Sequence, residues 1–223
     1  MEGKERWSTA ELLAPAGNRE RLDTALRYGA DAVYCGGKKL GLRAFSDNFD
    51  MEELSEAASY CHNQNKKIYF TLNAYLKQRD ISDLISYAKD VWATGIDAFI
   101  VSDPGALYLI KEALPQAEMH ISTQANVLNA AAARFWQQAG ASRIILAREC
   151  SLEDIRAIRD AVGDGLELEA FVRGAMCISY SGRCLLSSIL DGRDGNQGAC
   201  SQPCRRNYTL SERGESGALY PIE

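Results

Sequence analysis

Short apolar runs alternate with helix-like stretches along most of this chain, and this alternation limits the fold more than any other feature. Most of these runs are rich in β-branched or aromatic residues, and they span residues 11–17, 31–37, 67–75, 97–103, 118–124, 142–149 and 166–172. Nearly continuous apolar runs of this length are typical of parallel strands that are buried on both faces. The sequence therefore predicts a parallel sheet with helices between its strands.

The segments between the runs carry signals for helix starts. Candidate N-cap residues precede five helix-like stretches: Asn18, Asp50, Asp103, Asn129 and Ser151. Glu53 lies three residues after Asp50, as in a variant of the capping box, and Pro104 follows Asp103 at the first helical position. Alanine-rich faces in these stretches suit helices that pack on a sheet.

Two architectures fit strict alternation of this kind, a doubly wound sheet and a (β/α) barrel. No GxGxxG follows the first run, which weakens the dinucleotide-binding alternative, and seven uninterrupted units favour the barrel. A TIM-type barrel closes with eight strands. We therefore expect an α/β fold, a (β/α)8 barrel with about seven strands present, in a chain that is the front part of a longer protein. We expect 1–172 to form the barrel core and 173–223 to form, within the same domain, a cysteine-rich loop and the start of the segment that leads to the last strand.

Four cysteines lie within 28 residues near the end of the chain: Cys177, Cys184, Cys200 and Cys204. Six, fifteen and three residues separate them in turn, and several glycines between them allow sharp turns. Clustered thiolates are the ligands that soft metal centres use. The cysteine-rich loop is therefore a candidate metal site.

Composition and charge narrow the class of protein. Hydrophobic residues make up 46% of the chain and charged residues 25%, as in soluble globular proteins, and no apolar stretch is long enough to cross a bilayer. The first residues contain no apolar signal core, so we expect a cytoplasmic protein with reduced, metal-bound or catalytic cysteines. The net charge is −5, yet residues 172–213 carry six arginines against three acids. This segment is either a solvated loop or a basic lip for an anionic partner such as RNA or a carboxylate substrate.

The carboxyl ends of the strands are where such barrels place their chemistry, and polar residues gather there in this sequence. Buried polar groups of this kind need partners or a function. We predict catalytic roles for His120, Arg148 and Glu169, and substrate binding by Arg43, Asn73, Gln124 and Arg173. The arginines suit a dicarboxylate held by bidentate contacts. Arg148 and Glu149 are adjacent, so on a strand one faces the pocket while the other pairs outside.

Each of these residues also has a structural interpretation. His120 would then be a satisfied core histidine, the arginines would pair with acids on the rim, and Asn73 and Gln124 would be structural hydrogen-bonding residues.

The run EAFVRGAMCISYSGRCLLS resembles the signature of the U32 peptidase family, the collagenase-like proteins. The signature positions are Glu169, Phe171, Gly174, Ala175, Met176, Cys177, Gly182, Cys184, Leu186 and Ser187. The runs ELLAPAGNRERLDTALRYGADAVYCGG, HISTQ, LAREC and CSQPCR also resemble this family, so the likeness covers nearly the whole chain. Arg173 stands where many relatives carry a histidine.

The resemblance implies a chemistry other than peptide hydrolysis. Bacterial relatives hydroxylate nucleobases of tRNA or ribosomal RNA, or a quinone ring, without molecular oxygen, and prephenate is implicated as the oxygen source. Several carry a [4Fe-4S] cluster held by four cysteines. Carried over by position, Cys177, Cys184 and Cys200 resemble three cluster ligands, and the fourth is either Cys204 or a cysteine beyond this chain. Zinc held by thiolates is the alternative.

The hypothesis that follows is a tRNA-modifying hydroxylase that forms 5-hydroxyuridine, with prephenate as co-substrate and tRNA as partner. A collagenase-like, metal-dependent peptidase is one alternative, although the sequence has no HExxH, no GxSxG and no evident Cys/His/Asn arrangement. A hydroxylation partner for rRNA or a quinone ring is another, and a homodimer or a heterodimer with a family relative is open in each case.

Overall fold

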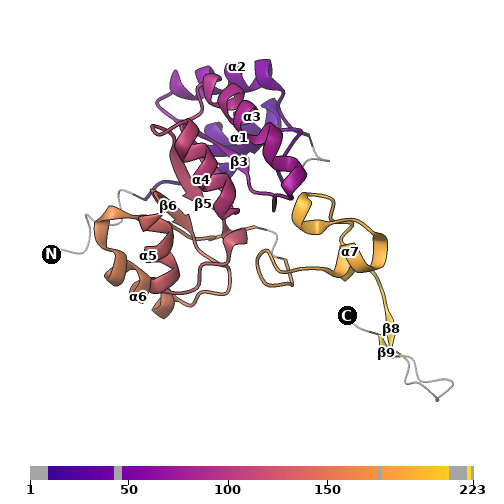
Figure 1. The fold of residues 1–223 in the computed structure, drawn as a ribbon. Coiled ribbons are helices and arrows are strands. Elements are labelled where there is room, and N and C mark those ends of the chain that lie inside the picture. The colour runs from indigo at the N-terminus through magenta and orange to yellow at the C-terminus, as the bar shows by residue number, and fades with distance from the viewer. Residues whose placement is uncertain (1–9, 43–46, 175–176, 211–219, 222–223) are drawn as a thin grey trace.

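Seven parallel strands form one curled sheet in this protein (Figure 1). The structure is a computed structural model and describes residues 10–42, 47–174, 177–210 and 220–221. Each strand pairs in parallel with the next one along the chain. The strands are β1 (Leu13–Pro15), β2 (Ala32–Gly36), β3 (Lys67–Leu72), β4 (Ala98–Val101), β5 (Glu118–Ile121), β6 (Arg143–Ile145) and β7 (Glu167–Glu169).

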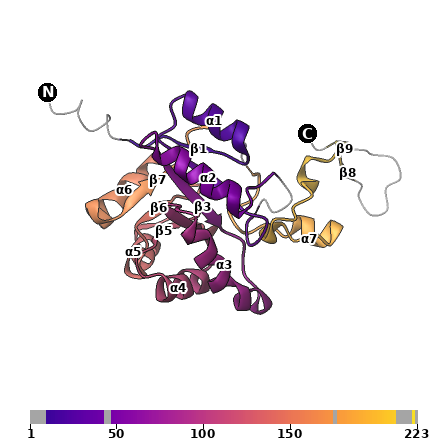
Figure 2. The same ribbon diagram turned by 90° about the horizontal axis from the view of Figure 1, so that it is seen from above.

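A helix follows each of the first six strands and lies on the outside of the curled sheet (Figure 2). The helices are α1 (Arg19–Arg27), α2 (Met51–His62), α3 (Ile81–Ala93), α4 (Pro104–Ala113), α5 (Ala130–Gln138) and α6 (Leu152–Val162). This arrangement confirms the predicted α/β fold of the (β/α)-barrel type. Within the described part of the chain the sheet has seven strands, with β1 and β7 at its two edges.

The predicted helix starts are found where the sequence placed them. The side chains that accept a hydrogen bond from the first helical turn are Asn18, Asp50, Asp103, Asn129 and Ser151. Glu53 completes the capping box by accepting a hydrogen bond from the Asp50 amide at 2.9 Å. These caps satisfy backbone donors that would otherwise lack partners, so each helix starts at a defined residue.

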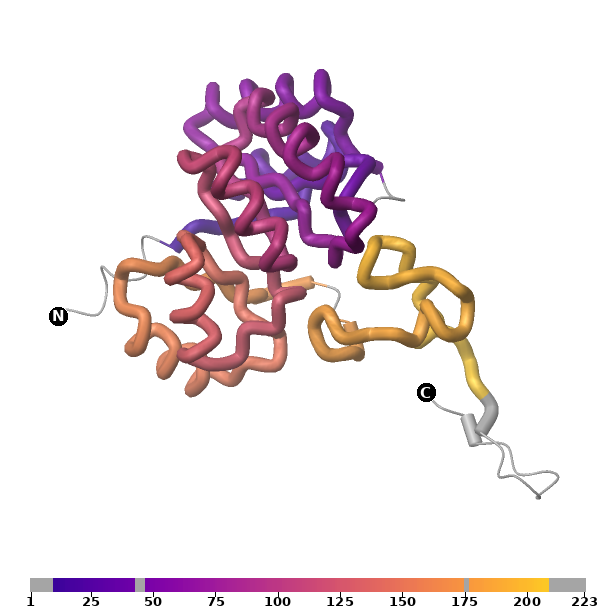
Figure 3. Tube along the Cα trace, viewed as in Figure 1, coloured from indigo at the N-terminus to yellow at the C-terminus, as the bar shows by residue number. Residues whose placement is uncertain are grey.

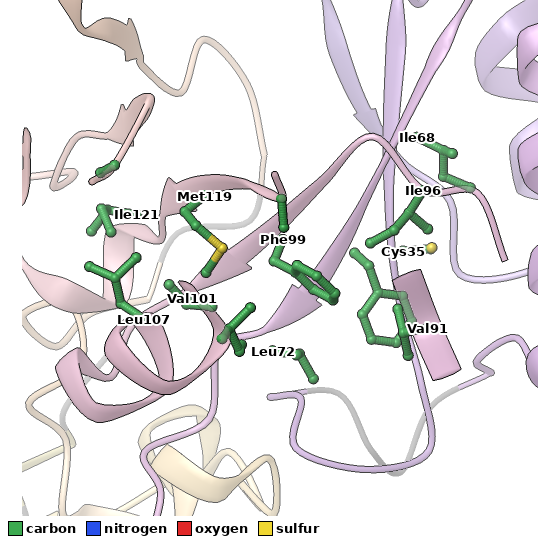
Figure 4. Close-up of a cluster of buried hydrophobic side chains, with 14 of the residues drawn as sticks. Cys35, Ile68, Leu72, Val91, Ile96, Phe99, Val101, Leu107, Met119 and Ile121 are labelled. Carbon is green, nitrogen blue, oxygen red and sulfur yellow. The ribbon is translucent and has the colours of Figure 1, made fainter. Parts of the chain in front are cut away.

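The main hydrophobic core lies between the outer face of the sheet and the helices (Figure 4). Phe99 and Met119 point outward from β4 and β5, and Val91 and Leu107 meet this layer from α3 and α4. All four are at most 2% exposed. Full burial of a side chain of this size contributes about 1.5–3 kcal/mol, so this layer is the main source of stability.

The opposite faces of the strands line the barrel interior. Tyr69, Ile100 and Ile145 form a second, smaller cluster there, together with two alanines. Ala98 and Ile100 face this interior while Phe99 and Val101 of the same strand face the helices, as the alternation of side chains along a strand requires.

After β7 the chain leaves the sheet and forms a separate lobe beside the barrel (Figure 3). This lobe contains α7 (Leu186–Asp191) and a two-stranded antiparallel pair, β8 (Thr209–Leu210) and β9 (Tyr220–Pro221). Short 3₁₀ turns complete the fold: η1 (Gln78–Asp80), η2 (Thr123–Ala125), η3 (Gly163–Gly165), η4 (Gly195–Gln197) and η5 (Pro203–Arg205). The division after residue 172 stays a prediction, and β7 ends at Glu169.

The lobe is hydrogen-bonded to the loop after β3. The Tyr75 amide donates to the Asn196 carbonyl at 3.0 Å, and the Gln197 side chain donates to the Tyr75 carbonyl at 3.1 Å. These bonds hold the cysteine-bearing lobe at the end of the barrel where the strands terminate.

Candidate functional site

A cavity of about 250 Å³ opens at the carboxyl ends of the strands. Four of the predicted site residues line it, Asn73, Gln124, Arg148 and Glu169, and they come from the ends of four different strands or the loops that follow. Other lining residues were not among the predicted site residues, including Arg21, Asn48, Thr71 and Phe171. Phe171 was named only as a signature position, and its place two residues after Glu169 was the available signal.

Small backbone features shape this cavity. Gly36 ends β2, and a Cβ there would lie 3.0 Å from Thr71 Oγ1, so a larger residue would press on the cavity wall. The η2 turn presents Gln124, and it is fixed by Ser122, whose hydroxyl accepts from the Gln124 amide at 3.3 Å. Asn73 also has a structural role, because its Oδ1 accepts from the Leu42 amide at 3.2 Å. Asn73 is therefore a structural hydrogen-bonding residue that also lines the cavity.

Arg148 is fixed on one edge by a buried serine. Its Nε and Nη2 donate to Ser181 Oγ at 3.0 and 2.9 Å, and Ser181 is fully buried. The Ser181 amide in turn donates to Glu149 Oε1 at 3.0 Å. Arg148 lines the cavity and Glu149 does not, as expected, but strand alternation is not the reason, because β6 ends at Ile145.

Below the cavity, the barrel interior contains an ionic network centred on Arg143, which is 6% exposed. Its Nη1 lies 2.6 Å from Glu11 Oε1, its Nε donates to Glu167 Oε2 at 2.7 Å, and its Nη1 lies 3.5 Å from Glu169 Oε2. The Tyr69 hydroxyl donates to Glu11 at 2.8 Å. Neither Glu11 nor Arg143 was among the predicted site residues.

This network shifts the pKa values of Glu11 and Glu169 in opposite directions. Burial would raise the pKa of Glu11, but hydrogen bonds from Arg143 and Tyr69 outweigh it, so the pKa lies below its usual value. Burial raises the pKa of Glu169 to about 7, and Arg143 only partly opposes this. Glu169 Oε2 is buried without a hydrogen-bond partner among the described residues. Glu169 is thus a cavity carboxyl that can hold or release a proton near neutrality.

His120 lies in the barrel interior rather than on the cavity. It is 1% exposed, and its ring packs edge-on against Tyr69 with the centroids 4.7 Å apart. Burial, with the charges of Arg143 and Lys67, lowers its pKa to about 3, so the ring is neutral at physiological pH. The geometry is that of a core histidine, and its catalytic role stays a prediction.

The cysteines of the lobe have the donor chemistry of a soft metal site. Cys177, Cys200 and Cys204 are exposed, Cys184 is half-buried, and all of them are free thiols. Cys200 Sγ accepts a hydrogen bond from the Gln202 amide at 3.4 Å, the kind of bond that tunes thiolate ligands. Across the described ranges, no three Cys, His, Asp or Glu side chains lie close enough together to hold a metal ion. The cysteines fit a metal in donor type, but the described side chains are not gathered into a metal site, and the ligand set stays a prediction.

The two remaining predicted residues are not part of the described cavity. Arg173 is exposed and does not line it. Arg43 lies outside the described residues. In the part of the chain that the structure describes, no helix combines the length and the hydropathy needed to cross a membrane.

The fold and the cavity define a (β/α)-barrel protein with a polar pocket at its strand ends and a cysteine-bearing lobe beside it. The model of Peptidase family U32 matches residues 17–220, and the chain belongs to this family. The resemblance of the signature around Glu169 and Cys177 is thereby confirmed.

Several relatives are similar over nearly the whole chain. The tRNA hydroxylation protein P1 of Bacillus subtilis is 41% identical over 209 residues, which is 94% of this chain and 49% of that protein. The tRNA hydroxylation protein P of Escherichia coli is 44% identical over 202 residues, 91% of this chain and 44% of that protein. A collagenase of Porphyromonas gingivalis is 36% identical over 223 residues, 96% of this chain and 53% of that protein. The chain spans about half the length of these relatives.

A solved structure, the U32 peptidase Mk0906, has the same fold. The TM-score is 0.62 at 16% sequence identity, and the match covers 73% of this chain and 68% of that chain. At this identity the likeness supports the fold alone.

Proposed function

We propose that this chain takes part in tRNA modification, as the barrel of a protein that hydroxylates uridine to 5-hydroxyuridine with prephenate and without molecular oxygen. The observation that carries the proposal is the identity of 41–44%, over about nine-tenths of the chain, to proteins named for tRNA hydroxylation in several bacteria. A relative named 23S rRNA 5-hydroxycytidine C2501 synthase, 39% identical, supports the same class of chemistry on RNA. We place the reaction in the cytoplasm, in keeping with seven free cysteines.

The cavity suits a small dicarboxylate such as prephenate. Arg148 is held through Nε and Nη2, and Nη1 makes no hydrogen bond within the described residues. A guanidinium held in place in this way is pre-organised to bind a carboxylate. Arg21 lies on the same cavity, and the amides of Asn73 and Gln124 add polar contacts. In this proposal these residues bind and orient the co-substrate.

The lobe would hold the cofactor and contact the RNA. Cys177, Cys184 and Cys200 would bind a [4Fe-4S] cluster, with Cys204 or a cysteine outside this chain as the fourth ligand, and zinc remains the alternative metal. A cluster would supply one-electron chemistry beside the cavity. Arg173 and Arg183 are exposed on the lobe and would contact phosphates of the tRNA backbone.

The test combines nucleoside analysis with metal analysis. The gene for the full protein is deleted, and tRNA nucleosides are measured by mass spectrometry. We expect 5-hydroxyuridine to disappear and to return with the wild-type gene, but not with Arg148→Ala. Arg156→Ala, an exposed arginine on α6, is the matched control and should restore it. Normal 5-hydroxyuridine in the deletion strain, with no paralogue present, would reject the proposal.

Metal analysis tests the ligand set separately. Protein purified without oxygen should contain iron and sulfide in equal amounts, and Cys177→Ser or Cys184→Ser should lose them. Cys61→Ser, at a fully buried thiol of the barrel core, is the control that keeps them. Zinc in place of iron would select the alternative metal.

A peptidase remains the second candidate, favoured by the 36% identity to the Porphyromonas gingivalis collagenase. Cleavage of gelatin by pure protein, abolished by a chelator, would support it. Gel filtration with and without family relatives tests the proposed homodimer or heterodimer.

A further inference from the structure

Three carboxyl groups share one guanidinium in the barrel interior. Arg143 contacts Glu11 at 2.6 Å and Glu167 at 2.7 Å, and it lies 3.5 Å from Glu169. The Lys67 ammonium lies 3.7 Å from Glu11, but its side chain is 56% exposed, so solvent screens its charge. One buried cation cannot neutralise three carboxylates, so the network favours a proton on one of them.

Glu169 is the member of the network that holds this proton most readily. Glu11 accepts hydrogen bonds from Arg143 and Tyr69, and Glu167 is 62% exposed and therefore solvated. Glu169 Oε2 is buried without a hydrogen-bond partner among the described residues, and its contact with Arg143, at 3.5 Å, is longer than those of the other two carboxylates. A buried carboxylate without hydrogen bonds is costly, whereas the neutral acid is not.

Glu169 also lines the cavity in which Arg148 and Arg21 lie. An anion that enters this cavity meets the arginines and the Glu169 carboxyl together. An ionised Glu169 repels the anion, and a protonated one can donate a hydrogen bond to it. The two protonation states therefore differ in their affinity for an anionic ligand.

We propose that Glu169 takes up a proton from solvent when an anionic ligand enters the cavity, and that Glu11 tunes this uptake by competing for Arg143. The inference rests on the proposed function for the presence of an anionic co-substrate. Glu169 is here a binding residue of the cavity, and Glu11 and Arg143 are positioning residues that act through it.

The other titratable groups that face Glu169, His120 and Tyr69, do not change their protonation near neutral pH and so cannot take up the proton in its place. The pKa of His120 is lowered to about 3 by burial and by the charges of Arg143 and Lys67, so His120 stays neutral at pH 7. Burial raises the pKa of the Tyr69 hydroxyl, which stays protonated. Burial raises the pKa of Glu169 to about 7, so both protonation states are populated near neutral pH and the ionised one can gain a proton.

Isothermal titration calorimetry tests the coupling between ligand binding and proton uptake. Prephenate is titrated into the full chain at pH 7 in buffers of different ionisation enthalpy, and we expect net uptake of up to one proton per ligand. Above pH 7 the affinity should fall by up to about tenfold per pH unit. Glu169→Gln should abolish the uptake and flatten the pH dependence, and Glu153→Gln, at an exposed carboxyl on α6 outside the network, should keep both. Glu11→Gln should move the maximum uptake to lower pH, because Arg143 is then freed for Glu169.

A measurement without ligand separates this inference from the proposed function. The chain is labelled with ¹³C at glutamate carboxyls, and the Glu169 signal is identified by its absence in Glu169→Gln. A titration midpoint near 7 supports the inference, and a midpoint near 4.5 overturns it. Failure of prephenate to bind at any pH would contradict the proposed function. Binding without proton exchange would overturn the coupling while leaving the proposed function in place.

Discussion

Replacing Arg143 with methionine should cost more stability than any other single change in the interior network. Arg143 is 6% exposed and is the cation for Glu11 and Glu169, whose side chains are 23% and 22% exposed. Breaking a buried ion pair on one side costs about 3–5 kcal/mol, because it leaves charge without a partner. Tyr69 still donates to Glu11, and partial exposure screens both carboxylates. We therefore expect a loss of about 3 kcal/mol at pH 8.

The pH dependence of this loss is the specific signature. The pKa of Glu11 in the folded protein lies below its usual value, because the hydrogen bonds from Arg143 and Tyr69 outweigh burial. Stability from such a group is present above the unfolded pKa and is lost as the pH falls through the folded one. In Arg143→Met the carboxyls of Glu11 and Glu169 can neutralise themselves by protonation at pH 5. The difference from wild type should therefore be larger at pH 8 than at pH 5.

Urea unfolding at both pH values measures this difference. Arg156→Met, an exposed arginine on α6, is the matched control and should change the free energy of unfolding by less than about 0.5 kcal/mol. A loss below about 1 kcal/mol for Arg143→Met at pH 8, or an equal loss at pH 5, would refute the assignment of Arg143 as the buried counter-ion.

Two further predictions concern the cysteine lobe and the thiols. Gly182→Ala should loosen the lobe and speed its limited proteolysis, because an added Cβ would collide with the Gln124 carbonyl of the η2 turn. Gly192→Ala, at a similar φ of 64° but in open space, is the control and should change the rate of proteolysis little. Equal rates of proteolysis for the two variants would contradict this. Maleimide should label the exposed thiol of Cys177 in the native protein, but the buried thiols of Cys35 and Cys61 only after unfolding. Burial raises the pKa of both buried thiols, that of Cys61 to about 11, so their reactive thiolate forms are scarce. Labelling of Cys61 in the native protein would contradict its burial in the core.

The fold could be predicted because apolar runs and helix caps are local signals. The lengths of the strands could not. The run 142–149 contains β6 only at Arg143–Ile145, and Leu146 and Ala147 are buried at 2% and 4% without continuing the strand. Their burial comes from the loop that packs under the η2 turn, where Thr123 donates to the Leu146 carbonyl at 3.0 Å. A buried loop and a buried strand look the same in a hydrophobic pattern.

The cavity residues could be predicted in part for the same reason. Asn73, Gln124, Arg148 and Glu169 are polar residues at or just beyond strand ends, and the barrel architecture brings such positions together. The pairing of Glu11 with Arg143 joins residues 132 positions apart and lies at the amino ends of the strands, whereas barrel chemistry is expected at their carboxyl ends. A signal did exist, because Glu167 and Glu169 alternate on β7 and must share one face.

Hydrogen bonds of Ser181 connect the cysteine lobe to Arg148 on the cavity. This serine lies four residues after Cys177 and three before Cys184, so its anchor holds the middle of the loop that joins the two thiols. Arg148 uses two nitrogens for this anchor and also lines the cavity. Because a guanidinium is rigid and planar, displacing Ser181 must turn the edge of Arg148 that a ligand would meet. A change that draws Cys177 and Cys184 together therefore acts on the arginine of the pocket as well as on the lobe.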